Sequence, residues 1–300
     1  MAGMRSILTL LFAGLCLSPP ATEAAPGRLD LLAGDGLENF QPVPRWHRVE
    51  RAAVVPHRTE LTTKGTQGGI LVNGLAKDIS IPYLMTRETF GDVRVELEFM
   101  IPQGSNAGVY LMGRYEVQIL DSFGKEKVGS GDLGGIYGSR NMSKPKGKRW
   151  VPGSRPLTNA AKAPGRWQKM EIVFRAPRFN ETGEKTADAV FESVKINGQL
   201  VQEDAVCTYP TQSHPLPGEV ALGPIAVQGD HGPIAIRRVT ATPLDSPGTG
   251  AMTEIDAYWD EVERAVREGD YEAYCATIHP DAVIISGPEA IEYLIEAGGN

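Results

Sequence analysis

The chain has 300 residues and an ordinary globular composition, with 41% hydrophobic and 22% charged residues. Its net charge of −7 argues against nucleic acid as a partner, because phosphate binding needs a basic surface. The 34 glycines and 22 prolines are spread between short apolar runs, which favours an all-β protein over a helical one.

The N-terminus has the features of an export signal. Arg5 precedes an apolar run from Ile7 to Leu17, and small residues follow. This run is too short for a permanent anchor, so cleavage after Ala24 or Ala25 would leave no integral membrane segment. We therefore expect residues 1–25 to be a signal peptide and the protein to be periplasmic or extracellular.

The cysteines point to no particular site. Cys16 raises the alternative of a lipoprotein, but Leu15 stands where such signals have a small residue. Cys207 and Cys275 lie in different segments, so no disulfide framework is predicted. The sequence contains no cysteine cluster or HExxH-like pair that would predict a zinc site.

Short apolar runs predict an antiparallel β-sandwich over residues 29–245. Residues 92–100 alternate most clearly, with apolar side chains on one face and Arg94, Glu96 and Glu98 on the other. Asn197-Gly198 predicts a tight hairpin turn. The predicted strands are a first strand and turn at Leu31–Phe40, then Ile70–Val72, Val93–Met100, Val109–Leu111, Tyr115–Leu120, Met170–Phe174, Val190–Ile196, Val220–Leu222 and Ile234–Thr242.

Three stretches differ from this pattern. Residues 122–164 are rich in Gly, Lys, Ser and Pro, and a loop of this length in a compact domain is usually functional. Residues 177–188 are polar and predict a surface excursion. After a linker at 246–252, residues 253–300 form a short helical segment, whose first helix we expect Gly269 to end.

One predicted strand carries an unusual set of polar side chains. Arg114, Glu116 and Gln118 project to one face of it, and Asp121 lies at its exit. A cation, a carboxylate and an amide in a row suit a ligand with many hydroxyl groups. The simpler alternatives are a solvated ion pair between Arg114 and Glu116 and a turn capped by Asp121.

A series of ordered motifs runs from about Leu31 to Leu244. They are Phe90-Gly91-Asp92-Val93, the run 104–110, Tyr115–Ser122, Gly135–Gly138, Lys162–Trp167, Ile196–Gly198, Gln228–Gly232 and Ile236–Val239. This series resembles the 3-keto-disaccharide hydrolase domain family, whose members have a concanavalin A-like (lectin/glucanase, jelly-roll type) sandwich. The resemblance implies an exported protein acting on glycosides oxidised at C3, by hydrolysis or by lyase-type cleavage.

The C-terminal segment resembles the start of a SnoaL-like domain. Trp259, Gly269-Asp270 and His279-Pro280-Asp281-Ala282-Val283 carry this likeness. Such domains are about twice as long as this segment, so residues 253–300 would be an incomplete N-terminal part.

The polar strand does not fit the paired-carboxylate mechanism of related sandwich glycosidases. Glu116 occupies the first carboxylate position, but Gln118 occupies the next, and an amide cannot exchange a proton at neutral pH. A 3-keto sugar offers another route. Its carbonyl acidifies the C2 hydrogen, so one base can start an elimination that expels the C1 substituent.

The acid/base partner is expected in the glycine-flanked loop 229–232. Histidine exchanges protons near neutral pH, and Asp230 could orient its neighbour or bind a cation. The predicted catalytic residues are His231, Glu116 and Asp230. The predicted substrate-binding residues are Arg114, Gln118, Asn106, Tyr110, Tyr137, Lys162 and Trp150. No cofactor is predicted with certainty, and a divalent cation held by Asp121, Glu116 or Asp230 is an open alternative.

Three functional hypotheses follow. The first is an exported enzyme that cleaves 3-keto-glycosides, with an oligosaccharide or glycoside as its partner. The alternative is a non-catalytic carbohydrate-binding module, which Gln118 favours and in which His231 would be a loop histidine held by the backbone. A third is a surface adhesion module to which residues 253–300 supply the partner contact.

Overall fold

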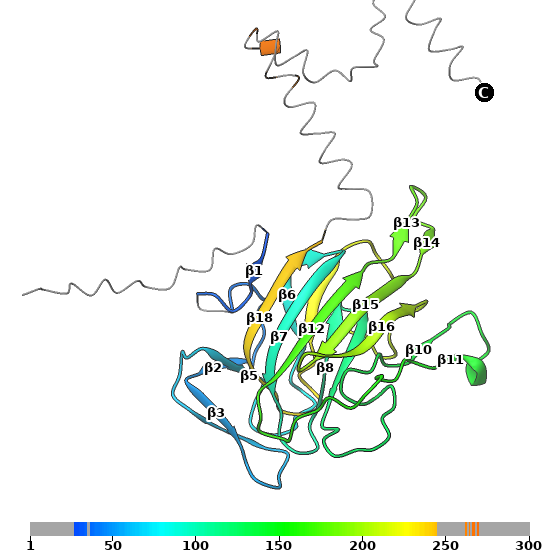
Figure 1. The fold of residues 1–300 in the computed structure, drawn as a ribbon. Coiled ribbons are helices and arrows are strands. Elements are labelled where there is room, and N and C mark those ends of the chain that lie inside the picture. Colours follow the sequence, from blue (N-terminus) through cyan, green and yellow to red (C-terminus); the bar gives the residue numbers. More distant parts are fainter. Residues whose placement is uncertain are drawn as a thin grey trace, which may run out of the picture.

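The protein is an antiparallel β-sandwich, as predicted. The computed structural model describes residues 27–34 and 37–244, together with residues 262, 264, 266, 267 and 269. Two sheets are stacked face to face, with β6 and β8 behind the larger sheet in the view of Figure 1. The larger sheet has the order β16 (Gln199–Cys207), β15 (Ala189–Ile196), β12 (Gln168–Arg175), β7 (Val93–Met100), β18 (Ala235–Pro243), β5 (Ile70–Val72) and β2 (His47–Val49), and β1 (Leu29–Asp30) pairs with β18.

The smaller sheet is built from four strands. Their order is β6 (Leu84–Phe90), β17 (Gly223–Val227), β8 (Asn106–Leu111) and β9 (Tyr115–Leu120). Three further strand pairs form separate two-stranded sheets: β3 (Arg51–Val54) with β4 (Leu61–Lys64), β10 (Ser139–Arg140) with β11 (Trp150–Val151), and β13 (Arg178–Phe179) with β14 (Lys185–Ala187). A short 3-10 helix, η1 (Lys146–Lys148), lies between β10 and β11.

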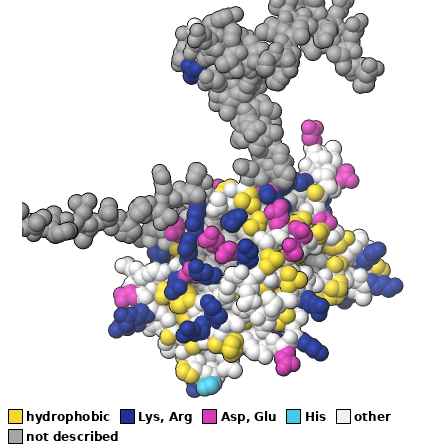
Figure 2. Space-filling model, viewed as in Figure 1, with side chains coloured by type: hydrophobic (Ala, Val, Ile, Leu, Met, Phe, Trp, Pro, Cys, Tyr) yellow, Lys and Arg dark blue, Asp and Glu magenta, His cyan; other side chains and the backbone are white. Residues whose placement is uncertain are grey.

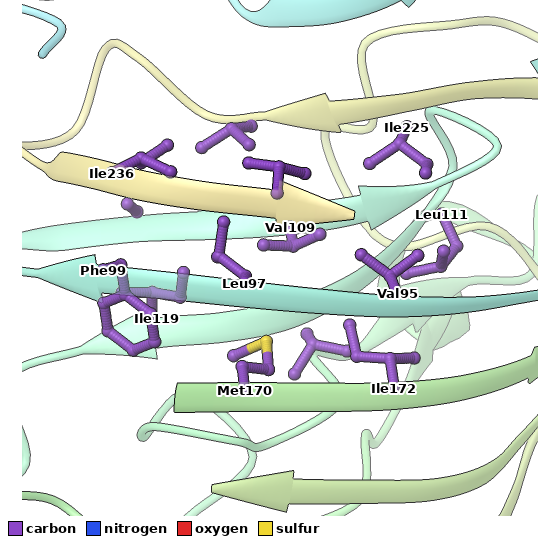
Figure 3. Packing of buried hydrophobic residues seen from close by; sticks show 14 of the residues in the cluster. Val95, Leu97, Phe99, Val109, Leu111, Ile119, Met170, Ile172, Ile225 and Ile236 are labelled. Carbon is purple, nitrogen blue, oxygen red and sulfur yellow. The ribbon is translucent and has the colours of Figure 1, made fainter. Parts of the chain in front are cut away.

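The core lies between the two sheets. Period-two alternation buries Val95, Leu97 and Phe99 of β7, which face Val109 of β8 and Ile119 of β9 (Figure 3). Removing this apolar surface from water is the main favourable contribution to the fold. One face of β8 and β9 is therefore committed to the core, and their other side chains must point away from it.

The outer face of the larger sheet is a mixed-charge surface. Glu98 of β7 pairs with Arg237 at 2.7 Å and with Lys169 at 3.6 Å, and Glu96 pairs with Arg28 at 2.8 Å. Figure 2 shows charges of both signs scattered over this side of the molecule. Ion pairs between solvated side chains need no ligand, so this face offers no evident substrate site.

Several strands begin and end where the sequence predicted. For β5, β7 and β9, the predicted first and last residues are the observed ones. The predicted hairpin joins β15 to β16, and Asn197 and Gly198 have φ values of 54° and 83°. Residues 122–164 are irregular apart from β10, η1 and β11.

Other predictions were wrong. Val220 and Leu222 are 40% and 60% exposed and precede β17, which begins at Gly223 because pairing with β6 begins there. The first strand, β1, ends at Asp30, before the predicted range Leu31–Phe40 begins, and residues 31–34 form a turn. The strand β6 was not predicted, because its Thr-Arg-Glu-Thr centre has no apolar alternation.

Few residues of the predicted C-terminal helix are described. Val262, Arg264, Val266 and Arg267 are helical, and Gly269 has a φ of 68° where the helix was expected to end. The predicted signal peptide, the linker 246–252 and the SnoaL-like motifs beyond Gly269 lie outside the described residues. Within the described part of the chain, no helix is long and apolar enough to cross a membrane.

Candidate active site

A cavity of about 520 Å³ lies on the outer face of the smaller sheet. It forms there because β8 and β9 turn their other face to the core, and its volume is typical of small-ligand sites. The side chains that line it come from both strands and from the loops around them. They are Tyr83, Asn106, Tyr110, Glu116, Gln118, Leu120, Gly131, Tyr137, Gln212, Ser213, Gln228, Asp230 and His231.

Glu116 lies at the base of this cavity and is only 2% exposed. Its carboxyl group covers Gly108 on the neighbouring strand, where a Cβ atom would lie 2.2 Å from Glu116 Oε1. Residue 108 must therefore be glycine for the carboxyl group to occupy this position. The backbone N–H of Glu116 donates a hydrogen bond to Thr211 Oγ1 at 3.0 Å, which ties the strand to the loop above it.

The environment of Glu116 favours its protonated form. Burial raises the pKa of this carboxyl to about 8, and the negative charge of Asp230 acts in the same direction. Hydrogen bonds with Tyr110 and Gln118 lower the pKa but do not offset burial. None of the interactions acting on this carboxyl comes from a cation, so the alternative of an ion pair with Arg114 is not what the structure shows. Glu116 can donate a proton at neutral pH.

Two tyrosines extend this network. Tyr110 is 2% exposed, and burial together with the charge of Glu116 raises the pKa of its phenol. Burial also raises the pKa of Tyr83, whose hydroxyl accepts a hydrogen bond from Gln228 Nε2 at 3.1 Å. The two rings meet edge to face with centroids 5.5 Å apart. Both phenols therefore stay neutral. The hydroxyl of Tyr110 is engaged with Glu116 and Tyr83, so the hydroxyl of Tyr83 is the one left to donate a hydrogen bond to a ligand.

His231 and Asp230 lie at the rim of the same cavity. His231 Nδ1 is 2.6 Å from Asp230 Oδ1, and the histidine side chain is 46% exposed. Because an ionised carboxylate only accepts hydrogen bonds, this contact places the proton of a neutral ring on Nδ1. Nε2 then carries the free lone pair and can act as a base.

The loop that carries His231 is held by Asn73, which is fully buried. Asn73 Nδ2 donates to the carbonyls of Gly229 at 2.8 Å and Gly232 at 2.9 Å, and Oδ1 accepts from the N–H of Ile234 at 2.8 Å. A Cβ on Gly232 would lie 2.4 Å from Ser105 Oγ, so the loop also needs glycine here. These contacts fix the loop against the sheet.

The remaining polar groups of the cavity suit hydroxyl recognition. Asn106 Oδ1 is buried and has no hydrogen-bond partner in the described part of the chain, which leaves an acceptor for a ligand. Tyr137 lines the cavity, and Trp150 packs edge-on against its ring at 5.9 Å. Trp150 therefore supports Tyr137 and does not line the cavity itself.

Arg114 lies outside the cavity. It occupies the turn between β8 and β9, and its guanidinium donates to the carbonyls of Met112 at 2.6 Å, Pro217 at 2.7 Å and Gly218. The strand β9 begins at Tyr115, after Arg114. Of the three polar side chains expected to face a ligand, only Glu116 and Gln118 therefore line the cavity. Arg114 positions a loop.

Lys162 and Asp121 also lie elsewhere. Lys162 is exposed and donates to the carbonyl of Trp167 at 3.4 Å. Asp121 accepts hydrogen bonds from the N–H groups of Gly104 at 2.9 Å and Phe123 at 3.3 Å, which is the turn-capping role that the sequence left as an alternative. Over the described residues, no three His, Cys, Asp or Glu side chains converge as a metal site would require.

Three residues of the site were not predicted from the sequence: Tyr83, Gln228 and Asn73. Gln228 begins the motif that contains His231, so its position was a usable signal. Tyr83 precedes β6, which was not predicted, so nothing in the sequence placed its side chain at the sheet. Asn73 directly follows β5, and an Asn after a strand usually indicates a turn and not a buried hydrogen-bonding role.

We expect Glu116→Gln to stabilise the protein at alkaline pH. The pKa rises from 4.5 in the unfolded chain to about 8 in the fold, so the wild type loses stability as pH rises through this window. The loss reaches up to roughly 4 kcal/mol at pH 8, and a neutral glutamine avoids it. Denaturant titrations at pH 4 and pH 8 measure the difference, with Glu203→Gln on the surface as control. If the free energy of unfolding of the wild type and of Glu116→Gln depends on pH to the same extent, Glu116 is not protonated in the folded protein.

Asn73→Ala should destabilise the fold by roughly 2–4 kcal/mol, because two carbonyls and one N–H lose a buried partner. Thermal unfolding measures this, and amide exchange should accelerate in residues 229–234. Asn39→Ala removes a single bond to the carbonyl of Leu31 and should cost less. If Asn73→Ala and Asn39→Ala lower the stability of the fold by the same small amount, Asn73 does not hold the loop.

Comparisons with known proteins found similar folds among solved structures. Two solved structures are similar to it, both candidate glycosyl hydrolases from Parabacteroides distasonis. The first is 23% identical, with 73% of this chain and 84% of the other covered and a TM-score of 0.49. The second is 18% identical, with 72% and 99% covered and a TM-score of 0.44. No match was found among curated proteins.

The sequence itself identifies the family. The 3-keto-alpha-glucoside-1,2-lyase-like domain matches residues 30–242, which include both sheets and all the residues that line the cavity. Membership supports glycoside cleavage as the general class of activity. The chain belongs to the family of 3-keto-alpha-glucoside-1,2-lyase-like domains.

Proposed function

We propose that this protein cleaves 3-keto-glycosides by removing the C2 proton and eliminating the substituent at C1. The observation that carries the proposal is the pairing, in one cavity, of a buried protonated carboxyl with a histidine oriented by a carboxylate. Such a pair supplies an acid and a base together at neutral pH. Family membership supports the same substrate class.

In the proposed first step, His231 Nε2 takes the proton from C2 of the sugar ring. The C–H electron pair forms the C2=C3 bond of an enolate, and the C3 oxygen becomes negative. Asp230 stabilises the protonated imidazole through Nδ1. The neutral phenol of Tyr83 is the hydrogen-bond donor available for the enolate oxygen.

In the second step, the C3 carbonyl reforms, C1=C2 forms and the C1–O bond breaks. Glu116 gives its proton to the departing oxygen, so the products are an alcohol and a 1,2-unsaturated 3-keto sugar. Proton exchange with solvent restores Glu116 and His231. Addition of water across the new double bond would give 3-keto-glucose, which makes the overall reaction a hydrolysis.

A non-catalytic carbohydrate-binding module is the second candidate. Gln118 favours it, because an amide stands where a second carboxylate would be and lines the cavity beside Glu116. In that case Asn106, Gln118, Gln228 and the tyrosines would bind hydroxyl groups, and no bond would be broken. Saturable binding without turnover would select this candidate.

The purified protein should convert 3-ketotrehalose to 3-keto-glucose or its unsaturated derivative. His231→Ala should lower kcat by roughly a hundredfold or more while the protein stays folded. Because Glu116 acts as the acid, kcat should fall as pH rises above about 8. Lys162→Ala, outside the cavity, is the control with unchanged rates. A folded wild type that yields neither product rules out the enzyme.

We also propose that the protein is exported, on the basis of the charged, apolar and small-residue order of its first 25 residues. The mature chain should begin at Ala25 or Pro26. N-terminal sequencing of the protein from its own cells would measure this, and a soluble form that retains Met1 as the only species would contradict export.

A further inference from the structure

Residues 133–170 differ in charge from the rest of the chain. They contain nine Lys and Arg and no Asp or Glu, although the whole chain has a net charge of −7. We call residues 140–155, where six of these cations fall, the basic ribbon. They are Arg140, Lys144, Lys146, Lys148, Arg149 and Arg155. Like charges repel one another, so a block of one sign in an acidic protein favours a partner of the opposite sign.

The basic ribbon projects from the sandwich. Its two strands pair over two positions only, Ser139 with Val151 and Arg140 with Trp150, and residues 141–149 extend beyond them. Figure 1 shows this loop standing out from the side of the molecule, and Figure 2 shows Lys and Arg side chains gathered at the same edge. Five of the six cations are exposed, and Arg149 is half-buried. A large partner can therefore reach them.

Hydrogen bonds within the loop hold it in one shape. The N–H of Asn141 donates to the carbonyl of Arg149 at 2.8 Å, which closes the loop at its foot. The N–H of Lys148 donates to the carbonyl of Pro145 at 2.8 Å, and Asn141 Oδ1 accepts from the N–H of Ser143 at 3.0 Å. The cations are carried on a preformed loop, so a partner orders little additional chain when it binds.

The six cations are not used within the protein. In the described part of the chain, none of them lies within 4.0 Å of a carboxylate oxygen. Glu203 and Asp204 line a cavity together with residues 151–154 at the foot of the ribbon, but they form no ion pair with it. Glu219 lines a cavity with Arg140 and is occupied by Lys185 Nζ at 3.2 Å. The positive charge of the ribbon is therefore available to a partner.

The ribbon has too little apolar surface to enter a membrane. Between residues 141 and 149, Met142 is the one large apolar side chain, and it is 65% exposed. One part of the Trp150 ring covers Gly138, where a Cβ atom would lie 2.2 Å from it. Segments that lie in a membrane interface need a continuous apolar face beside their cations. A hydrated partner that carries many anionic groups fits this loop better.

The foot of the ribbon lies beside the candidate active site. Residues 140–143 line a cavity of about 830 Å³, and Gln212 and Ser213 line both this cavity and the one that contains Glu116. A chain molecule held on the ribbon is therefore kept close to the Glu116 cavity, which raises its local concentration there. A chain of sugars fits this position best, because the family supports glycoside cleavage.

We propose that the basic ribbon is a docking surface for a polyanionic polysaccharide, whose rings carry carboxylate or sulfate groups. The ammonium groups of Lys144, Lys146 and Lys148 attract these anions from solution, and the negative charge of the rest of the protein directs the polymer to this edge. This docking does not depend on the proposed 3-keto reaction, so it is measured as binding without turnover.

The test is calorimetric titration of the purified protein with dextran sulfate, polygalacturonate and neutral dextran. The wild type should bind at least one of the two anionic polymers and not the neutral one. Raising NaCl from about 50 to about 200 mM should weaken binding roughly tenfold, since the contacts are exposed and screened by salt. Unchanged affinity at the higher salt would contradict an electrostatic docking surface.

The variant Lys144→Gln/Lys146→Gln/Lys148→Gln should bind about tenfold more weakly. Its matched control is Lys64→Gln/Lys77→Gln/Lys127→Gln, which removes the same charge from exposed positions outside the ribbon and should bind as the wild type does. Lys144→Arg/Lys146→Arg/Lys148→Arg should also retain binding, because it keeps the charge. Thermal unfolding checks that all three variants are folded.

Three results would overturn the proposal. The first is that the wild type binds neither anionic polymer. The second is equal weakening by the two glutamine variants, which would mean that overall charge and not the ribbon attracts the polymer. The third is tighter binding to phosphatidylglycerol vesicles or to duplex DNA than to either polysaccharide, which would make the partner a membrane or a nucleic acid.

Discussion

The carboxyl group of Glu116 occupies a space that exists because residue 108 has no side chain. Gly108 on β8 lets this carboxyl lie flat against the neighbouring strand, out of contact with water. Burial without a cation is what keeps Glu116 protonated, since desolvation penalises the charged form. A larger residue at position 108 would push the carboxyl toward solvent, lower its pKa and remove the acid from the site.

The rest of the site is arranged around that buried group. The inner faces of both sheets form the core, and the outer face of the larger sheet is covered by ion pairs. Within residues 37–244, the outer face of the smaller sheet is the one that combines polar side chains with covering loops. Asn73 holds one of those loops and Arg114 holds another, so two side chains outside the cavity lining define where the loops at 229–232 and 217–218 lie.

In the proposed reaction, this arrangement lets a sandwich of the lectin/glucanase type act without paired carboxylates. Gln118 contributes a hydrogen bond that lowers the pKa of Glu116 but cannot exchange a proton itself. The base must then come from another element, and His231 reaches the same cavity from the loop after β17. An acid on the sheet and a base on a loop suit the proposed removal of a proton from C2 and the delivery of another to the oxygen that departs from C1.

Much of this could be predicted from the sequence, because alternation and turn chemistry are local. The period of two along 92–100 and 115–120 determined which side chains enter the core, and Asn197-Gly198 determined a hairpin. Family motifs indicated a sugar site. Seven of the predicted residues line one cavity: Asn106, Tyr110, Glu116, Gln118, Tyr137, Asp230 and His231.

Only the tertiary structure decided how those residues are used. Arg114 is adjacent in sequence to the site, yet its partners Pro217 and Gly218 are 103 and 104 positions away, and Asn73 meets its loop across 156 positions or more. No local pattern encodes such contacts, because they depend on which loops the two sheets bring together. The protonation of Glu116 is likewise a consequence of burial, which a strand acquires only when the loops close over it.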